Sequence, residues 1–298
     1  MSLFDRLVDE AIRNQAGLAP LRVVVEKELL HHDILREMSH AGLLASLTFI
    51  GGTCLRACYG SSRLSEDLDF TGGADFSRAS LTALAQLLEE RLQRKYGLHV
   101  EVSEPRRETG NVDTWKLRVQ TRPGRPDLPA QRINIAICAI PSHAPRPMML
   151  RNHYGVDMGT GGLILQAQSR EEILADKLVA FALRPNRLKN RDLWDIAWLD
   201  QQGVVLPLQL LPLKLGDHRC ETAHFIEQLT ERRQMLLSEA QLHEDFRHEM
   251  RRFLPAAVVS DTVEQPAFWQ YLTTLVGEQC QHAIDFFRAD DTKPRFRM

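Results

Sequence analysis

The chain has 298 residues, of which 44% are hydrophobic and 26% charged, and its formal net charge is −2 at pH 7. This balance excludes an intrinsically disordered chain, and the small net charge excludes RNA binding through a global basic excess. The five cysteines are scattered and lack Cys-x-x-Cys spacing, which predicts buried free thiols. The sequence has no apolar run of membrane-spanning length and no secretory signal, so we expect a cytoplasmic protein with no membrane partner.

Two helices are expected before residue 45. Apolar residues recur at helical spacing over residues 3–12 and 21–38, and Gly17 and Pro20 separate the two runs. The pattern indicates no chemistry in this region. His31, His32 and His40 are interpreted as surface or helix-end residues.

A short apolar strand over residues 47–50 is followed by Gly51 and Gly52, and then by a brief helix over residues 53–59 that Gly60 ends. Glycines let the backbone approach a ligand closely, and the free amides at a helix start attract anions. The turn at residues 51–53 is therefore a candidate phosphate-binding element.

Asp67 and Asp69 alternate with the apolar Leu68 and Phe70, which is the period of a half-buried strand. Residues two apart on a strand point to the same face, so both carboxylates should project together. Like charges at that distance repel unless a proton or a divalent cation lies between them. A carboxylate pair that can hold Mg²⁺, close in sequence to a phosphate-binding turn, predicts a site for nucleoside triphosphates.

Further elements follow in an order that predicts an α+β (mixed α/β) fold, with a small mixed sheet flanked by helices. The expected elements are an amphipathic helix over residues 76–95 and strands over residues 99–102, 115–120 and 131–138. Residues 141–162 are rich in Pro, Gly and His and are interpreted as an irregular connection, in which His143 and His153 have no expected role.

Lys177 lies on the apolar stripe of a helix expected over residues 171–183, so it should either extend its ammonium group to solvent or pair with an anion. Pro185 ends this helix, and the basic residues Arg187, Lys189 and Arg191 follow. Asp192 and Asp195 then share one face of the next helix. Taken alone, this pattern describes a helical hairpin with surface charges.

The remainder, from residue 200 onward, is expected to be all-helical. The candidate helices span residues 225–237, 239–253 and 268–287. Five arginines in this region could form an RNA-facing strip, namely Arg232, Arg233, Arg247, Arg251 and Arg252. We favour the alternative that they lie on solvated helix faces and are balanced by acidic residues. The tail from Lys293 is expected to be frayed.

Three stretches, in order, resemble the motifs of the AbiEii-type nucleotidyltransferase toxins, which belong to the DNA polymerase-β-like nucleotidyltransferase superfamily. The first is Gly-Gly-Thr at residues 51–53 with Arg-Leu-Ser-Glu-Asp-Leu-Asp-Phe at residues 63–70. The second is Glu-Glu-Ile-Leu-Ala-Asp-Lys-Leu at residues 171–178, and the third is Lys-Asn-Arg-Asp-Leu-Trp-Asp at residues 189–195. The resemblance implies a nucleotidyltransferase sheet domain at residues 46–160, between N-terminal helices at 1–45 and a helical domain at 161–298 that completes the active site.

The resemblance also implies roles for individual residues. Asp67 and Asp69 would hold Mg²⁺ (or Mn²⁺), and Gly51, Gly52, Thr53 and Ser65 would bind the nucleotide. Lys177 would contact the triphosphate. Asp192 would complete the site as the general base, with Asp195 as the alternative.

Asn134 stands where the superfamily often has a third carboxylate, which leaves the general base open. The implied substrates are an NTP and an RNA acceptor such as a tRNA 3′ end. The implied partner is a separately encoded antitoxin, commonly a DNA-binding regulator. The alternatives are transfer to a small molecule or a protein, and a catalytically degenerate binding protein.

Overall fold

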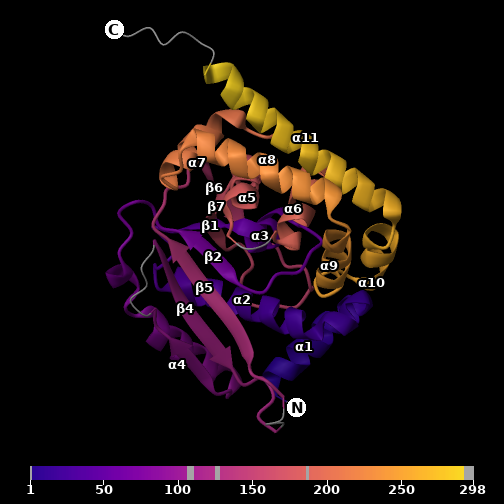
Figure 1. The fold of residues 1–298 in the computed structure, drawn as a ribbon. Helices are drawn as coiled ribbons and strands as arrows, with labels where there is room; N and C mark the ends of the chain where they lie inside the picture. The colour runs from indigo at the N-terminus through magenta and orange to yellow at the C-terminus, as the bar shows by residue number, and fades with distance from the viewer. Residues whose placement is uncertain (1, 106–110, 125–127, 186–187, 292–298) are drawn as a thin grey trace. The chain divides into compact units, whose positions relative to one another are not determined.

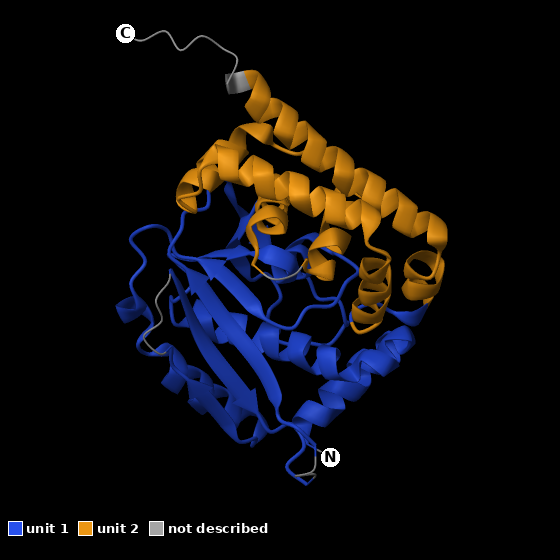
Figure 2. Ribbon diagram, viewed as in Figure 1, with its two compact units in different colours: residues 1–169, 253–256 blue, residues 170–252, 257–298 orange. Residues whose placement is uncertain are grey.

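A computed structural model describes residues 2–105, 111–124, 128–185 and 188–291 (Figure 1). Arg187 and the tail from Lys293 lie outside these ranges. The chain divides into two compact units (Figure 2). The sheet unit comprises residues 1–169 and 253–256, and the helical unit comprises residues 170–252 and 257–298.

The sheet unit is built on a seven-stranded sheet with the strand order β3-β4-β5-β2-β1-β7-β6. Its strands are β1 Thr48–Ile50, β2 Leu68–Thr71, β3 Val100–Ser103, β4 Val112–Val119, β5 Gln131–Cys138, β6 Pro145–Met149 and β7 Ile164–Gln168. β2 runs parallel to β5, and β1 runs parallel to β7, whereas the other neighbours are antiparallel. The predicted mixed α/β fold with a mixed sheet is thereby confirmed.

The neighbouring strands β5, β2 and β1 bury apolar side chains that form the core of the sheet unit. In β5, Ile133, Ile135 and Ile137 are buried, whereas Arg132 is exposed and Asn134 and Ala136 are half-buried. On the neighbouring strands, the rings of Phe49 and Phe70 stack with their centroids 5.1 Å apart. These side chains form the core beside which the candidate site is built.

Four α-helices of the sheet unit are α1 Leu3–Asn14, α2 Arg22–His40, α3 Gly51–Cys54 and α4 Leu84–Tyr96. α2 contacts both α4 and β5, and Figure 1 shows it beside the sheet. The helix predicted over residues 76–95 begins later than expected, because residues 78–81 form a separate 3₁₀ turn that Ser77 caps. The helix predicted from Thr53 begins instead at Gly51 and continues as a π-helical turn to Tyr59.

The expectation of an irregular connection over residues 141–162 is wrong for residues 145–149, which form β6, and holds for the others. β6 is the last strand of the sheet, and Pro145 and Pro147 remove two of its N–H groups. Proline is tolerated on such a strand because only one side of it pairs. β7, for which the sequence analysis gives no strand, pairs with β6 over its whole length.

The helical unit confirms the predicted helical C-terminal region. Its helices include α5 Arg170–Leu183, α6 Asn190–Gln201, α7 Leu211–Asp217, α8 Thr222–Ser238, α9 Ala240–Met250 and α11 Pro266–Asp291; the short α10 Ala256–Val258 begins at the last residue of the sheet unit. α11 packs along α8, with the rings of Phe225 and Phe287 5.8 Å apart.

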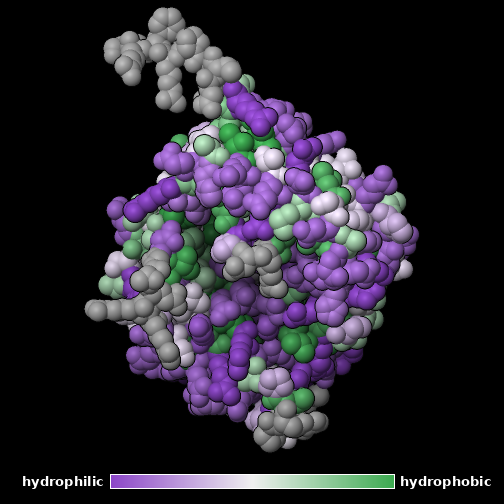
Figure 3. All heavy atoms as spheres, in the orientation of Figure 1, coloured by the Kyte–Doolittle hydropathy of each residue, from purple (hydrophilic) through white to green (hydrophobic). Residues whose placement is uncertain are grey.

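Hydrophilic residues cover most of the surface seen in Figure 3, and the hydrophobic ones form small separate groups. Within the described residues, no helix combines the length and the apolar character that crossing a membrane requires. All five cysteines are free, and Cys54, Cys58 and Cys280 are buried. The prediction of free thiols is therefore confirmed, although Cys138 and Cys220 are only partly buried.

Replacing Phe49 should test the core described here. Phe49→Ala removes a ring that is 0% exposed, so it should lower the free energy of unfolding by about 3–5 kcal/mol. Ile164 is 64% exposed on β7, so Ile164→Thr should change it by about 0.5 kcal/mol or less. Chemical denaturation of both variants provides the comparison, and equal losses would contradict the core position of Phe49.

Candidate active site

The glycine turn lies directly against one of the two predicted carboxylates. β1 leads into Gly51, whose φ is +74°, a left-handed conformation that favours glycine. Ile50 pairs with Asp69 on β2. A Cβ atom added at Gly51 would lie 3.4 Å from Asp69 Oδ2, so the missing side chain keeps the space beside this carboxylate open.

Asp67 and Asp69 share one face of the strand, as predicted. Asp69 lies in β2, and Asp67 is the residue just before this strand. Both aspartates are half-buried, whereas Leu68 and Phe70 are buried on the other face. Gly51, Asp67 and Asp69 therefore lie at one end of β2. What these residues do stays a prediction at this point.

Asn134 lies beside Asp67 and contacts it twice. Its backbone N–H and its side-chain Nδ2 both donate to Asp67 Oδ1, at 2.9 and 3.0 Å. The residue in place of a third carboxylate is thus a neutral donor. It fixes the orientation of Asp67 and adds no negative charge to the pair.

Thr53 connects the turn to the segment that carries the aspartates. Its Oγ1 lies 2.5 Å from Ser65 Oγ and also donates to the carbonyl oxygen of Asp67. Both hydroxyl side chains are buried, at 3% and 5% exposure. The residues predicted to bind phosphate are therefore linked by hydrogen bonds within one unit.

The donor set at the end of β2 fits Mg²⁺. This ion is usually held by one or two carboxylates together with waters and substrate phosphates, rather than by a cage of protein ligands. Asp67 and Asp69 supply two carboxylates on one face, with open space at Gly51. Among the described residues, no group of three or more His, Cys, Asp and Glu side chains is arranged to hold a metal ion.

In the helical unit, Lys177 is enclosed by acidic side chains. Its Nζ lies 2.5 Å from Asp192 Oδ1 and 2.8 Å from Asp195 Oδ2. Arg184 Nη1 contacts the other oxygen of Asp192 at 2.6 Å. Of the two outcomes expected for Lys177, the structure shows the pairing with an anion. The alternative of surface charges is wrong, because Asp192 and Asp195 are 2% and 0% exposed.

The cations around Asp192 keep it charged. Burial favours the neutral acid, but the attraction of Lys177 and Arg184 outweighs burial and holds the pKa of Asp192 well below its usual range. Lys189 adds a third positive charge. The pKa of Lys189 is itself lowered, chiefly by burial, although the charge of Asp192 opposes the shift.

Lys214 is a buried residue that the sequence analysis missed. On α7, it is 1% exposed, and its Nζ lies 2.5 Å from Glu172 and 3.0 Å from Asp176, both on α5. The available signal is a single lysine in the apolar run Leu-Leu-Pro-Leu-Lys-Leu. This pair ties α7 to the helix that carries Lys177.

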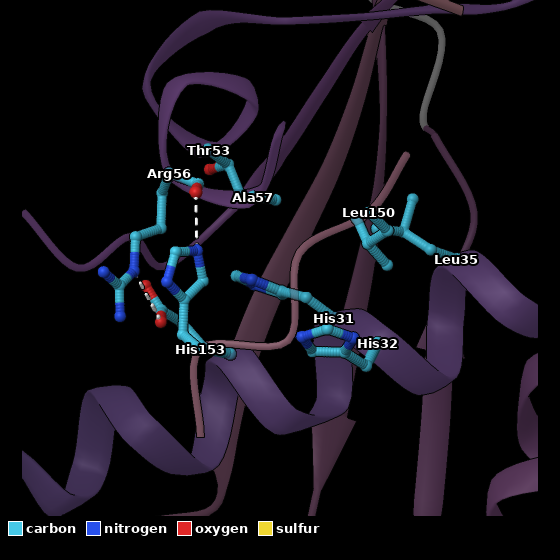
Figure 4. Close-up of a pocket in the computed structure, with 9 residues that line it drawn as sticks. His31, His32, Leu35, Thr53, Arg56, Ala57, Leu150 and His153 are labelled. Carbon is cyan, nitrogen blue, oxygen red and sulfur yellow. Dashed lines mark hydrogen bonds and ion pairs between the residues drawn. The ribbon is translucent and has the colours of Figure 1, made fainter. Parts of the chain in front are cut away.

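A small pocket lies next to Thr53 in the sheet unit (Figure 4). His31, His32 and His153 line it, and burial lowers the pKa of each, that of His32 to about 4, so all three are neutral at pH 7. The expectation that His31 and His32 are surface or helix-end residues is wrong, since they are 4% and 6% exposed. His40 is exposed, as expected.

Four of the five arginines considered as an RNA-facing strip make contacts within the helical unit. Arg247 and Arg251 contact Glu264 at 2.5 and 2.7 Å. Arg232 donates to the carbonyl oxygen of Arg184 at 2.9 Å, and Arg233 donates to that of Gly277 at 3.1 Å. Arg247 and Arg251 therefore have an acidic partner, as the favoured interpretation expects, whereas Arg232 and Arg233 bind backbone carbonyl oxygens.

A mixed sheet that brings a carboxylate pair to a glycine turn is an arrangement that suits the binding of a cation and a phosphate group. The sequence profile described as "Nucleotidyl transferase AbiEii toxin, Type IV TA system" matches residues 33–274. The chain therefore belongs to the AbiEii nucleotidyltransferase toxin family of type IV toxin–antitoxin systems, as its three motifs predict. A nucleotide substrate and an antitoxin partner follow from this membership.

Solved structures also resemble the chain. JHP933 from Helicobacter pylori has 15% sequence identity and a TM-score of 0.46, over 90% of this chain and 94% of that one. A "putative nucleotidyltransferase" from H. pylori has 16% identity and a TM-score of 0.45, over 90% of this chain and 99% of that one. None of the curated proteins compared with the chain matches it.

Asn134→Asp should make the stability of the protein more dependent on a divalent cation. The substitution removes one donor to Asp67 and places a third carboxylate beside the pair, so repulsion should lower the melting temperature in EDTA. Mg²⁺ should then raise it by more than in the wild type. Asn134→Ala, which removes the donor without adding charge, is the matched control, and an equal response to Mg²⁺ in both variants would contradict the expectation.

Asp192→Asn should destabilise the helical unit at neutral pH by about 3–5 kcal/mol, because Lys177 and Arg184 lose a buried counter-charge. Because the folded-state pKa of Asp192 is lowered, the stability it contributes is present above about pH 4 and is lost as the pH falls further. The difference between variant and wild type should therefore shrink below about pH 4. Chemical denaturation at a series of pH values from 7 to 3 measures the free energy of unfolding of both proteins. A difference that stays constant over this range would contradict the ion-pair account.

Proposed function

We propose that this protein transfers a nucleoside monophosphate from a nucleoside triphosphate to an RNA acceptor, and that this transfer arrests growth. The observation that carries the proposal is the position of Asp69 against the Gly51 turn, with Asp67 on the same face. The carboxylates can bind a cation and the turn leaves room for phosphates. Together they provide what an in-line attack on an α-phosphate requires.

We assign the β- and γ-phosphates to Gly52, Thr53 and Ser65. The Ser65 amide already donates to the carboxylate of Glu28, at 2.8 Å. The hydroxyl of Ser65, 2.5 Å from that of Thr53, is therefore the group that would meet a phosphate. Because Thr53 gives its one hydroxyl hydrogen to the carbonyl oxygen of Asp67, the hydroxyl of Ser65 donates to Thr53, and it would turn to donate to a bound phosphate.

Asp67 and Asp69 are the residues that we assign to Mg²⁺, and Mn²⁺ takes the same oxygen ligands. When bound, the ion supplies positive charge to the triphosphate and to the attacking oxygen. The two donors of Asn134 hold Asp67 in one orientation, so this carboxylate is positioned before any ligand binds.

We assign Lys177 to the charge that develops on the leaving pyrophosphate, as the family motif implies. Its two acidic partners hold its ammonium group in one place. A carboxyl with a pKa far below its usual range is a weak base. We therefore propose that Asp192 and Asp195 anchor Lys177, and that the proton of the acceptor hydroxyl passes to water.

The acceptor that we propose is a tRNA 3′ end, which presents the hydroxyl that such a transfer needs. The proposed antitoxin is a separately encoded protein that regulates transcription by binding DNA. We propose a cytoplasmic location, because NTPs and tRNA are both present there. A small molecule or a protein would be an alternative acceptor for the same chemistry.

The test uses purified protein, Mg²⁺, total cellular RNA and each of the four α-labelled NTPs in turn. Wild type should label one RNA size class from one NTP. Asp69→Asn should lower the labelling by a factor of about 10³ or more, because the cation loses a charged ligand. Asp75→Asn changes an exposed aspartate on the following loop and should leave the rate unchanged.

Other outcomes would contradict particular parts of the proposal. Growth arrest that survives Asp69→Asn in cells would contradict the mechanism. Label on a small molecule or a protein, with none on RNA, would contradict the acceptor. Tight binding of Mg²⁺–NTP without turnover on any acceptor would identify a catalytically degenerate binding protein.

A further inference from the structure

The helix α2 contacts the segment that leads into the aspartate pair through three side chains. Lys27 Nζ pairs with Glu66 Oε1 at 2.8 Å. His31 Nε2 lies 3.0 Å from the carbonyl oxygen of Glu66, which can only accept, so the imidazole donates. Between them, Glu28 Oε1 accepts from the backbone N–H of Ser65 at 2.8 Å.

Glu28 also binds two side chains from other parts of the sheet unit. Its Oε2 accepts from Arg56 Nε at 3.1 Å and from the hydroxyl of Tyr154. Arg56 follows the glycine turn in sequence, and its Nη1 donates to the carbonyl oxygen of Ser61 at 3.0 Å. Figure 4 shows the contact of His153 with the carbonyl oxygen of Arg56, at 2.7 Å.

Glu28 is therefore a buried carboxylate with a donor on each side. Burial alone would raise its pKa, but the charge of Arg56 and the donors from Tyr154 and Ser65 more than compensate and lower it. The carboxylate is only 5% exposed. A charge held by three donors in a dry environment resists displacement, since any movement would leave a donor without its partner.

We propose that Glu28 is a positioning residue of the nucleotide site, acting through the backbone amide of Ser65 to hold the Ser65 hydroxyl, beside that of Thr53, where it meets the phosphates. The inference rests on the nucleotide site proposed above. Ser65 Oγ lies 2.5 Å from Thr53 Oγ1, and Thr53 in turn donates to the carbonyl oxygen of Asp67. A shift of the Ser65 backbone therefore reaches both hydroxyls and the first aspartate.

Glu28→Gln breaks this arrangement selectively. Glutamine keeps one acceptor oxygen, and the site of Glu28 Oε2 has two donors, from Arg56 and Tyr154. The new amide NH₂ group then faces the N–H of Ser65, and two donors in contact repel. The hydrogen bond to Ser65 is thus the one that the variant loses.

Glu26 offers a matched control on the same helix. It is 2% exposed and contacts Gln131 Nε2 at 2.5 Å, Arg22 Nε at 3.3 Å and Arg122. Glu26 is therefore a buried glutamate paired with arginine, like Glu28. Its partners, however, lie on β5, at the start of α2 and in the loop after β4, and not at the nucleotide site. Glu26→Gln should cost comparable stability and leave nucleotide binding unchanged.

The experiment measures the Kd for each of the four NTPs with Mg²⁺ by calorimetry, together with the melting temperature. Glu28→Gln should weaken binding about tenfold or more relative to Glu26→Gln at a similar melting temperature. Ser65→Ala should cost little further affinity in the Glu28→Gln background, although it weakens binding on its own. Such non-additivity identifies an effect that passes through Ser65 and that a general loss of stability would not produce.

Tyr154→Phe keeps the inference testable if Glu28→Gln does not fold. It removes one of the donors to Glu28 and should weaken binding by a smaller factor, about threefold. If wild type binds an NTP and none of these variants changes its Kd, or if Ser65→Ala is fully additive, the inference is overturned and the proposed function stands. Wild type that binds no NTP would overturn both.

Discussion

The like charges of Asp67 and Asp69 are the constraint on which the proposed nucleotide site depends. The two carboxylates project from one face at the end of β2, and a pair of like charges at that spacing favours the binding of a cation. The donors that reach Asp67 are the neutral amides of Asn134, which orient the carboxylate and leave its charge in place. Gly51 keeps the space beside Asp69 open. Asp67 is thus held in one orientation, and Gly51 leaves room for a ligand beside Asp69.

In the helical unit, the buried charges described here are paired with side chains of opposite charge. Lys177 has two carboxylate partners, Asp192 has two cationic ones, and Lys214 is enclosed by two acidic side chains of α5. Buried charges are costly unless each has partners, and these clusters provide them. The gain is a lysine with little freedom to move. A pre-positioned ammonium group can stabilise developing phosphate charge without the cost of first ordering a flexible side chain.

The elements that could be predicted from the sequence are those with a strong local period. β5 has its predicted bounds, 131 and 138, because isoleucine alternates with polar or small residues along it, and the Asp67 and Asp69 pair follows from the same period of two. β6 was missed because prolines suppress the strand signal at an edge of the sheet. Glu28 carries no local signal, since its partners Ser65 and Tyr154 are 37 and 126 residues away in sequence. An acidic residue on an amphipathic helix looks solvent-exposed until the fold brings its donors to it.

A crystal structure with Mn²⁺ and a non-hydrolysable NTP would test the central claim most directly, because Mn²⁺ is located by its anomalous scattering. The account predicts one Mn²⁺ bound by both Asp67 and Asp69, with the β- and γ-phosphates at the hydroxyls of Thr53 and Ser65. Mn²⁺ and nucleotide bound elsewhere on the protein, with neither aspartate in contact with the metal, would contradict it.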